Sequence, residues 1–182
     1  SLGIAKESIQ RIGKEDQVEF HQGSVEELPF EDNTFDYIVS NGVIHHTPGT
    51  EAAADEFLRV LKPGGKASVC IYYRNAFLRQ PLWQVTKMAM PILLNKKDGR
   101  EDFLSSKTPE DFVKVYDGNN TPIAKVYSKA EADRLFSKFK ILDREPHFFP
   151  VRFLKCIKTG GWVHEFLDRN FGCLIYYLLE KK

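Results

Sequence analysis

The sequence of 182 residues lacks any apolar run near the ~18 residues that span a bilayer, and it does not open on a basic and then apolar signal peptide. Its three cysteines (Cys70, Cys156 and Cys173) are scattered, without the spacing of metal ligands. The basic residues form no compact cluster interleaved with aromatic residues, as nucleic-acid binding would require. These absences predict no metal site, no nucleic-acid partner and no stable membrane insertion, and they favour a reduced, cytoplasmic setting.

The net charge of +1 hides an uneven distribution along the chain. Residues 1–65 contain five Lys/Arg against twelve Asp/Glu, a net charge of −7, and the remainder contains 21 against 13, a net charge of +8. A basic second half could attract an anionic substrate or a membrane surface. A solvated, lysine-rich surface is the simpler interpretation, because exposed charge is the usual case.

The pattern between residues 18 and 73 is that of alternating strands and helices. Residues 35–40 are rich in aromatic and β-branched residues and predict a parallel strand buried on both faces. Residues 47–61 predict a helix that ends at a Pro-Gly-Gly turn, and residues 66–73 predict the next strand. Before them, residues 6–12 predict a helix with Gly13 as its cap, and residues 18–20 predict a short strand.

The rest of the chain has clear local signals for helices and strands. Residues 76–94 predict one or two short apolar helices interrupted by Pro81 and Pro91, and residues 96–107 predict a loop. Thr108 and Ser128 each precede an acidic first turn, which predicts a helix start at both places. Further elements are predicted as a helix over 162–169 and strands over 140–144, 148–156 and 173–179.

Three motifs in one order carry a resemblance to a known family. They are residues 23–30 (GSVEELPF), residues 35–46 (FDYIVSNGVIHH) and residues 61–65 (LKPGG). In this order within about sixty residues they resemble the class I S-adenosylmethionine-dependent methyltransferases of generic small-molecule type. The resemblance is strong over residues 18–73 and weaker over residues 126–182.

The resemblance implies an α/β fold with a Rossmann-like, doubly wound, mostly parallel sheet. It assigns residues 1–74 and 124–182 to the methyltransferase-like core and residues 75–123 to a helical lid insertion. Two family elements are absent: the glycine-rich loop after the first strand and the acid that grips the ribose. The chain also begins at Ser1 without a Met, so we expect a truncated member whose sheet is incomplete at its amino-terminal half.

The resemblance also implies a cofactor site for S-adenosylmethionine at the carboxyl ends of the strands. Ser24 would lie beside the adenine amine and Val25 would pack on the ring. Asn41 would meet the methionine amine through its backbone carbonyl, and Gly42 would let the chain turn close to the sulfonium, beside His46. Ser24 has an alternative interpretation as an ordinary turn former.

No residue is a clear catalyst, and His45, His46 and Tyr72 are weak candidates. A histidine on the loop facing the transferred methyl group could orient or deprotonate a nucleophile. Both histidines could equally be packing residues, and Tyr72 could be a core aromatic with its hydroxyl paired. A dedicated base is optional, because methyl transfer from a sulfonium mainly requires alignment and exclusion of water.

Two functions therefore remain open from the sequence. The first is a methyltransferase that acts on a small or lipid-like acceptor, and the second is a non-catalytic methyltransferase-like module for binding or assembly. The gap in the sheet would be closed by pairing the residue 18–20 strand with the residue 35–40 strand, or by a homodimer through an exposed sheet edge.

Overall fold

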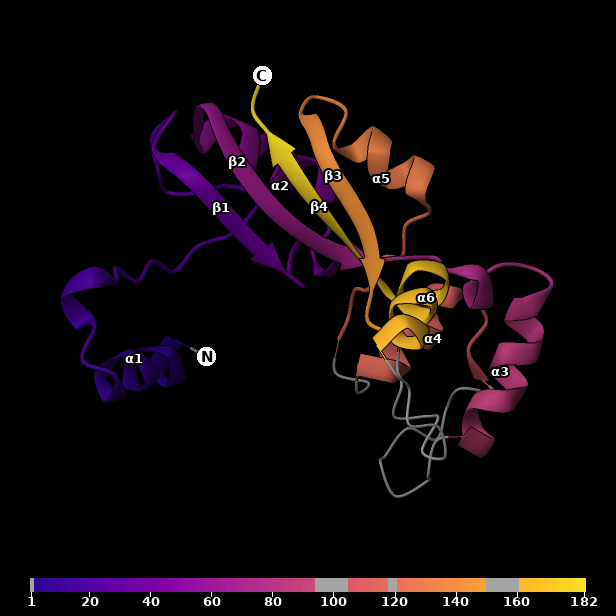
Figure 1. Ribbon diagram of the computed structural model, residues 1–182. Helices are drawn as coiled ribbons and strands as arrows, with labels where there is room; N and C mark the ends of the chain where they lie inside the picture. Colours follow the sequence, from indigo (N-terminus) through magenta and orange to yellow (C-terminus); the bar gives the residue numbers. More distant parts are fainter. Residues whose placement is uncertain (1, 94–104, 118–120, 150–160) are drawn as a thin grey trace.

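The computed structural model describes residues 2–93, 105–117, 121–149 and 161–182 (Figure 1). These residues form a mixed α/β fold around one four-stranded sheet. The elements, in chain order, are α1 (Leu2–Arg11), η1 (Glu15–Gln17), β1 (Phe35–Asn41), η2 (Ile44–His46), α2 (Thr50–Val60), β2 (Leu61–Tyr72), η3 (Ala76–Leu78), α3 (Leu82–Leu93), α4 (Pro109–Asp117), α5 (Lys129–Leu135), β3 (Lys140–His147), α6 (Gly161–Phe171) and β4 (Leu174–Glu180).

The sheet has the strand order β1-β2-β4-β3. β1 and β2 are parallel, with Asn41 opposite Cys70, and they are joined through α2 as a crossover unit. β4 runs antiparallel to both β2 and β3, so β1, β2 and β3 share one direction. The Rossmann-like α/β fold class, with a mostly parallel set of strands, is therefore confirmed.

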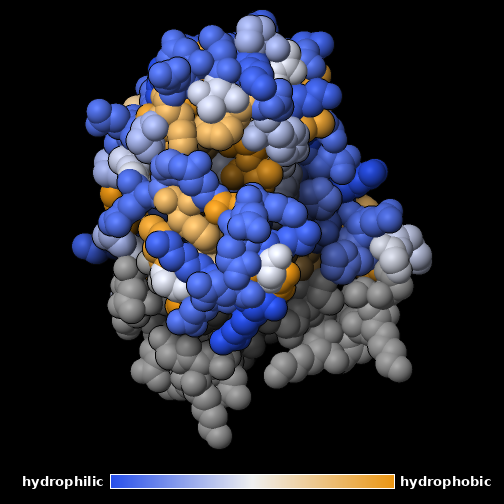
Figure 2. All heavy atoms as spheres, turned by 90° about the vertical axis from the view of Figure 1, so that its left-hand side faces the viewer, coloured by the Kyte–Doolittle hydropathy of each residue, from blue (hydrophilic) through white to orange (hydrophobic). Residues whose placement is uncertain are grey.

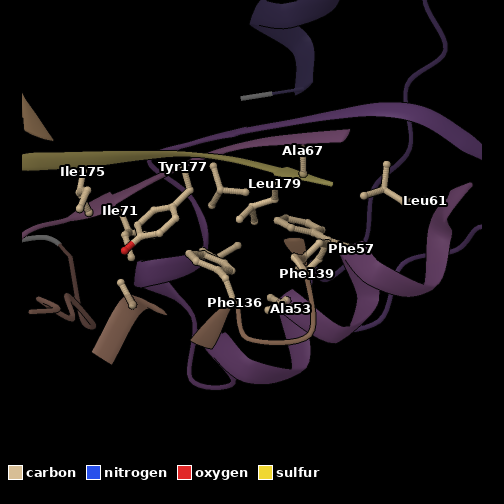
Figure 3. Close-up of a cluster of buried hydrophobic side chains, with 14 residues drawn as sticks. Ala53, Phe57, Leu61, Ala67, Ile71, Phe136, Phe139, Ile175, Tyr177 and Leu179 are labelled. Carbon is tan, nitrogen blue, oxygen red and sulfur yellow. The ribbon is translucent and has the colours of Figure 1, made fainter. Parts of the chain in front are cut away.

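The main core lies between one face of this sheet and helices α2 and α5 (Figure 3). Ala53 and Phe57 of α2 and Phe136, just after α5, pack against residues of β2 and β4. Tyr177 is fully buried in this layer, and its hydroxyl donates to Asp133 Oδ1 at 2.8 Å. Burial raises the pKa of Tyr177, and the neighbouring Asp133 carboxylate raises it further.

A second apolar cluster lies in the region predicted as an insertion. Trp83 of α3 meets Phe112 of α4 edge-on, with ring centroids 5.4 Å apart. The cluster includes Ala124 and Val126, which belong to the segment that returns to the main core. The predicted division at residues 75–123 stays a prediction.

The locally signalled helix starts are confirmed. Ser128 forms the capping box with Glu131 at the start of α5. At the start of α4, Thr108 Oγ1 accepts from the Asp111 N–H at 3.1 Å. The predicted helices over 6–12 and 162–169 correspond to α1 and α6, and Gly13 has a φ of +62°. Pro91 was expected to interrupt the apolar segment, but it lies inside the continuous helix α3, so this expectation is wrong.

Several expectations are corrected or lie outside the described residues. Residues 18–20 form no strand, and their expected pairing with β1 is wrong, since β1 pairs with β2 alone among the described residues. β1 is not buried on both faces, since Val39 is 71% exposed. Most of the predicted loop over 96–107 and of the strand over 148–156 lies outside the described residues.

Candidate functional site

The carboxyl ends of β1 and β2 bring together most of the candidate residues. Asn41 ends β1, and Gly42 follows with a φ of +73°, a conformation that glycine adopts without strain. The Gly42 N–H donates to the Cys70 carbonyl at 3.3 Å, which directs the chain across the end of β2. The short helix η2 then places His45 and His46 beside Tyr72, the last residue of β2.

The three rings form one cluster. The His45 ring centroid lies 4.2 Å from those of both His46 and Tyr72, and the His46 and Tyr72 centroids are 5.6 Å apart. The cluster follows directly from the parallel pairing of β1 and β2, because the carboxyl ends of parallel strands meet at one edge of a sheet. The structure thus groups three residues that the sequence offered as separate candidates, and their roles stay predictions.

His45 is fully buried and behaves as a packing residue. Burial, together with the nearby His46, lowers the pKa of His45 to about 3, although a weaker interaction with the Cys70 backbone opposes the shift. Neither ring nitrogen of His45 has a hydrogen-bond partner among the described residues. A neutral imidazole with no exposed surface favours the packing interpretation for His45 over a role as a base.

His46 has a defined orientation and is only partly buried. Its Nδ1 lies 2.9 Å from the Ile123 carbonyl oxygen. Because a carbonyl oxygen can only accept, this contact requires a proton on Nδ1. When the ring is neutral, the proton is on Nδ1 and the lone pair is on Nε2. This tautomer accepts a proton at Nε2.

The Ser24–Val25 turn is attached to α2. Ser24 Oγ accepts from the Glu26 N–H at 3.1 Å, which fits the turn-former interpretation, and Val25 packs partly buried against the main core. Glu26 Oε1 accepts from the Gly49 N–H at 2.7 Å, directly before α2. Asn41, Gly42 and His46 belong to the turn after β1, whereas Ser24 and Val25 belong to a separate turn that Glu26 joins to Gly49.

Arg59 of α2 binds residues 28–30, which follow the Ser24–Val25 turn. Its guanidinium donates to the carbonyls of Leu28 and Phe30 at 3.1 and 2.8 Å and to Glu56 at 2.7 Å. Glu56 in turn accepts from the Leu28 N–H at 2.7 Å, and the pKa of Glu56 is lowered by its bond with Arg59. The resemblance gave no role to Arg59 or Glu56, although an acid three residues before an arginine on a predicted helix is a visible signal.

Residues 121–127 are the part of the site that sequence reasoning missed. The Lys125 N–H donates to the His45 carbonyl at 3.0 Å, and the Tyr127 N–H donates to the Tyr72 carbonyl at 3.0 Å. Together with the contact between Ile123 and His46, these bonds hold residues 121–127 next to the cluster of His45, His46 and Tyr72. No local pattern indicates such contacts, because the partners are 55 to 80 residues apart in the sequence.

A pocket of about 700 Å³ opens next to this segment, between the start of α2, residues 125–127 and α5. Its volume is in the range of small-molecule sites. Arg74 donates to Glu110 at 3.0 Å and to Glu131 at 3.3 Å, which offsets two of the acids in the lining. Lys125 Nζ donates to Thr50 Oγ1 at 3.0 Å at the same place.

The part of the chain that the structure describes has no group of three or more His, Cys, Asp or Glu arranged to hold a metal ion. Nor is any helix in those residues both long enough and apolar enough to cross a membrane.

We compared the sequence and the structure of the chain with those of known proteins. Residues 1–69 match the family model described as a methyltransferase domain. Over these residues the chain is similar to methyltransferase domains. The matched region contains Ser24, Asn41 and His46, whereas Tyr72 and residues 121–127 lie beyond it.

Curated relatives match the chain over a limited length. A demethylmenaquinone methyltransferase of Bacillus cytotoxicus is 41% identical over 70 residues, which are 38% of this chain and 29% of the relative. A ubiquinone/menaquinone biosynthesis C-methyltransferase, UbiE, of Brucella anthropi is 47% identical over 66 residues, 36% of this chain and 25% of the relative. The chain thus spans well under half the length of these relatives.

Solved structures extend the similarity of fold to nearly the whole chain. An S-adenosylmethionine-dependent methyltransferase of Thermotoga maritima covers 97% of this chain with a TM-score of 0.53 at 19% identity, and the match spans 70% of that protein. The [4+2]-cyclase SpnF covers 99% with a TM-score of 0.59 at 17% identity, over 62% of its own chain. The same fold therefore occurs in proteins named for different reactions, and the reaction must be argued from the site.

Proposed function

We propose that the protein to which this chain belongs is a methyltransferase that uses S-adenosylmethionine and transfers a methyl group to a small or lipid-like acceptor. The observation that carries the proposal is the grouping of Asn41, Gly42, His46 and Tyr72 at the carboxyl edge of β1 and β2, with the first three inside the segment that matches the family model. Relatives named for methylation of quinone precursors favour an acceptor of that chemical class.

The residues present fit one side of the cofactor. A side chain added to Gly42 would meet no atom within 4 Å, so the backbone there is open to close approach by a ligand. Asn41 and Gly42 would hold the methionine end together with His46, and Ser24 with Val25 would hold the adenine end. When bound, S-adenosylmethionine supplies an electrophilic methyl group.

The roles of the protein residues follow from their protonation and burial. His46, with Nδ1 held by Ile123, presents Nε2 as the proton acceptor for an acceptor hydroxyl or an acidic carbon. His45 stays neutral and fixes the position of the His46 ring by packing. Tyr72 would line the acceptor side of the site, next to the His46 ring.

The proposal also gives roles to residues 75–123 and to the unpaired edge of β1. Residues 75–123 would act as the lid, because their own apolar cluster connects to the site through Val126 and Tyr72. The open edge of β1 would accept a second copy of the chain, and this assembly does not bear on methyl transfer.

The alternative is a non-catalytic module with the same fold. The observation that favours it is that the same fold also occurs in a protein named as a [4+2]-cyclase, so the fold alone does not fix methyl transfer. Such a module would bind the cofactor or a partner without transferring a methyl group. The two functions differ in one observable, the appearance of a methylated product.

A methyl-transfer assay with a demethylmenaquinone acceptor and S-adenosylmethionine tests the proposal, with the product identified by mass spectrometry. We expect product from the wild-type protein and a decrease in kcat of about 10²–10⁴ for His46→Ala, the usual contribution of a positioned base. Phe166→Ala, at an exposed position of α6, should leave the rate unchanged and serves as the control. Absence of product would leave the binding module, and an active His46→Ala variant would contradict the role of His46.

A further inference from the structure

Residues 121–127 contact the two histidines of the site at neighbouring points. The Lys125 N–H donates to the His45 carbonyl at 3.0 Å. Two residues earlier in the chain, the Ile123 carbonyl accepts from His46 Nδ1 at 2.9 Å. Because these two contacts are so close along the backbone, the position of Lys125 determines where the Ile123 carbonyl lies relative to the His46 ring.

The side chain of Lys125 joins the same segment to the start of α2. Its Nζ donates to Thr50 Oγ1 at 3.0 Å and to the Pro48 carbonyl. Lys125 is therefore bonded to the chain on both sides of His46, through its N–H to the residue before and through its ammonium to residues two and four positions after. Few side chains could hold this segment at two separate places.

The place of the Lys125 ammonium is unusual for a lysine. Lysines mostly belong to hydrophilic surface, which makes up most of the side of the molecule seen in Figure 2. Lys125 is only partly exposed, and no carboxylate in the described part of the chain forms an ion pair with it. Its ammonium lies at the N-terminal end of α2, where the helix dipole disfavours a cation, although Glu51 in the first turn offsets part of this cost. Stabilisation of α2 therefore does not explain this lysine.

We infer that Lys125 is a positioning residue that holds the Ile123 carbonyl against His46 Nδ1 and so keeps the lone pair of His46 on Nε2. The hydrogen bond made by one ring nitrogen decides which nitrogen of a neutral histidine carries the proton. The inference rests on the proposed function, in which Nε2 accepts a proton, but the arrangement that it describes exists without any substrate.

The end of the segment is held independently of Lys125. Arg74 donates from its guanidinium to the Val126 carbonyl at 3.0 Å and from its N–H to the Tyr127 carbonyl at 2.8 Å. Removal of the Lys125 ammonium should therefore loosen residues 123–125 and leave the fold intact.

Nitrogen-15 NMR of the histidine rings in the free chain measures the tautomer directly, with the His46 signals assigned by their loss in His46→Ala. We expect neutral His46 in the wild type to carry its proton on Nδ1, and Lys125→Met to lower the share of that tautomer by about half. Lys138→Met is the matched control, because Lys138 Nζ also bonds a residue of α2, the exposed Asp55. A wild-type ring with its proton on Nε2, or an equal change in both variants, would overturn the inference.

A second variant approaches the same bond from α2. Thr50→Val removes the hydroxyl that accepts from Lys125 and keeps nearly the same volume, so it should shift the tautomer of His46 in the same direction as Lys125→Met. A shift in neither variant would show that the ammonium does not position the Ile123 carbonyl.

The methyl-transfer assay then separates this inference from the proposed function. Lys125→Met should lower kcat about tenfold, because a misplaced base loses part of its contribution, and Lys138→Met should leave kcat unchanged. A wild-type protein without product would contradict the proposed function, whereas the tautomer would still decide the role of Lys125. A lower kcat with an unchanged tautomer would overturn that role.

Discussion

The side chains of β1 and β2 are buried on one face of the sheet and more exposed on the other. On the face towards α2 and α5, Val69 is fully buried and Ile38 packs against the core. On the opposite face Val39, next to Ile38 in the sequence, is 71% exposed. The sequence of β1 is apolar on both sides, as in strands covered by helices on both faces. The difference shows that the described part of the chain completes one layer of a doubly wound fold and leaves the other open.

The largest loss of stability should come from removing a buried side chain on the face of the sheet that α2 and α5 cover. Phe136 is fully buried and contacts Tyr177, with ring centroids 5.0 Å apart. We expect Phe136→Ala to lower the free energy of unfolding by about 3–5 kcal/mol, the cost of a lost buried ring and its cavity. Urea denaturation measures the loss. Phe166→Ala, at a 56% exposed site, should stay within about 0.5 kcal/mol, and a similar loss in both variants would contradict the assignment of the core.

A matched pair of valines sharpens the same comparison. Val69→Ala on the covered face removes two buried methyl groups, so we expect a loss of about 2 kcal/mol in the free energy of unfolding. Val39→Ala on the open face should change it by less than about 0.5 kcal/mol. Equal losses would mean that both faces of the sheet are covered in solution.

The buried His45 should give a smaller, pH-dependent effect. Its folded-state pKa of about 3 is below the unfolded value of 6.5, so the unfolded state binds more protons and stability falls as the pH decreases from 6.5 towards 3. Between pH 7 and pH 5.5 this group alone costs about 1 kcal/mol. Denaturation of wild type and His45→Leu at both pH values measures it. The wild type should lose that much more stability than the variant, and parallel losses would show that His45 does not titrate as its burial requires.

The success of prediction from the sequence depended on how local each signal was. The Ser128 capping box and the Thr108 helix start were readable because all the partners lie within one helical turn. The sequence offered His45, His46 and Tyr72 only as separate candidates, and the structure groups them because parallel strands place their carboxyl ends side by side.

Longer-range features were not readable. The strand expected over residues 18–20 did not form, since a strand needs a neighbour and the pattern could not show that none was present. The contact of His46 with Ile123 joins residues 77 apart, and nothing near either residue indicates it. The burial that makes His45 neutral likewise depends on distant segments, including residues 121–127.

The central claim is that the turn after β1 forms one side of a cofactor site. Calorimetric titration with S-adenosylhomocysteine tests it most directly, with two glycine variants of equal strain. Gly42 and Gly64 have φ values of +73° and +75°, and an added side chain meets no atom at either, but only Gly42 lies at the site. We expect one-to-one binding in the micromolar range, about −8 kcal/mol, that Gly42→Val weakens at least tenfold and Gly64→Val leaves unchanged. No binding, or equal weakening by both variants, would contradict the assignment of the site.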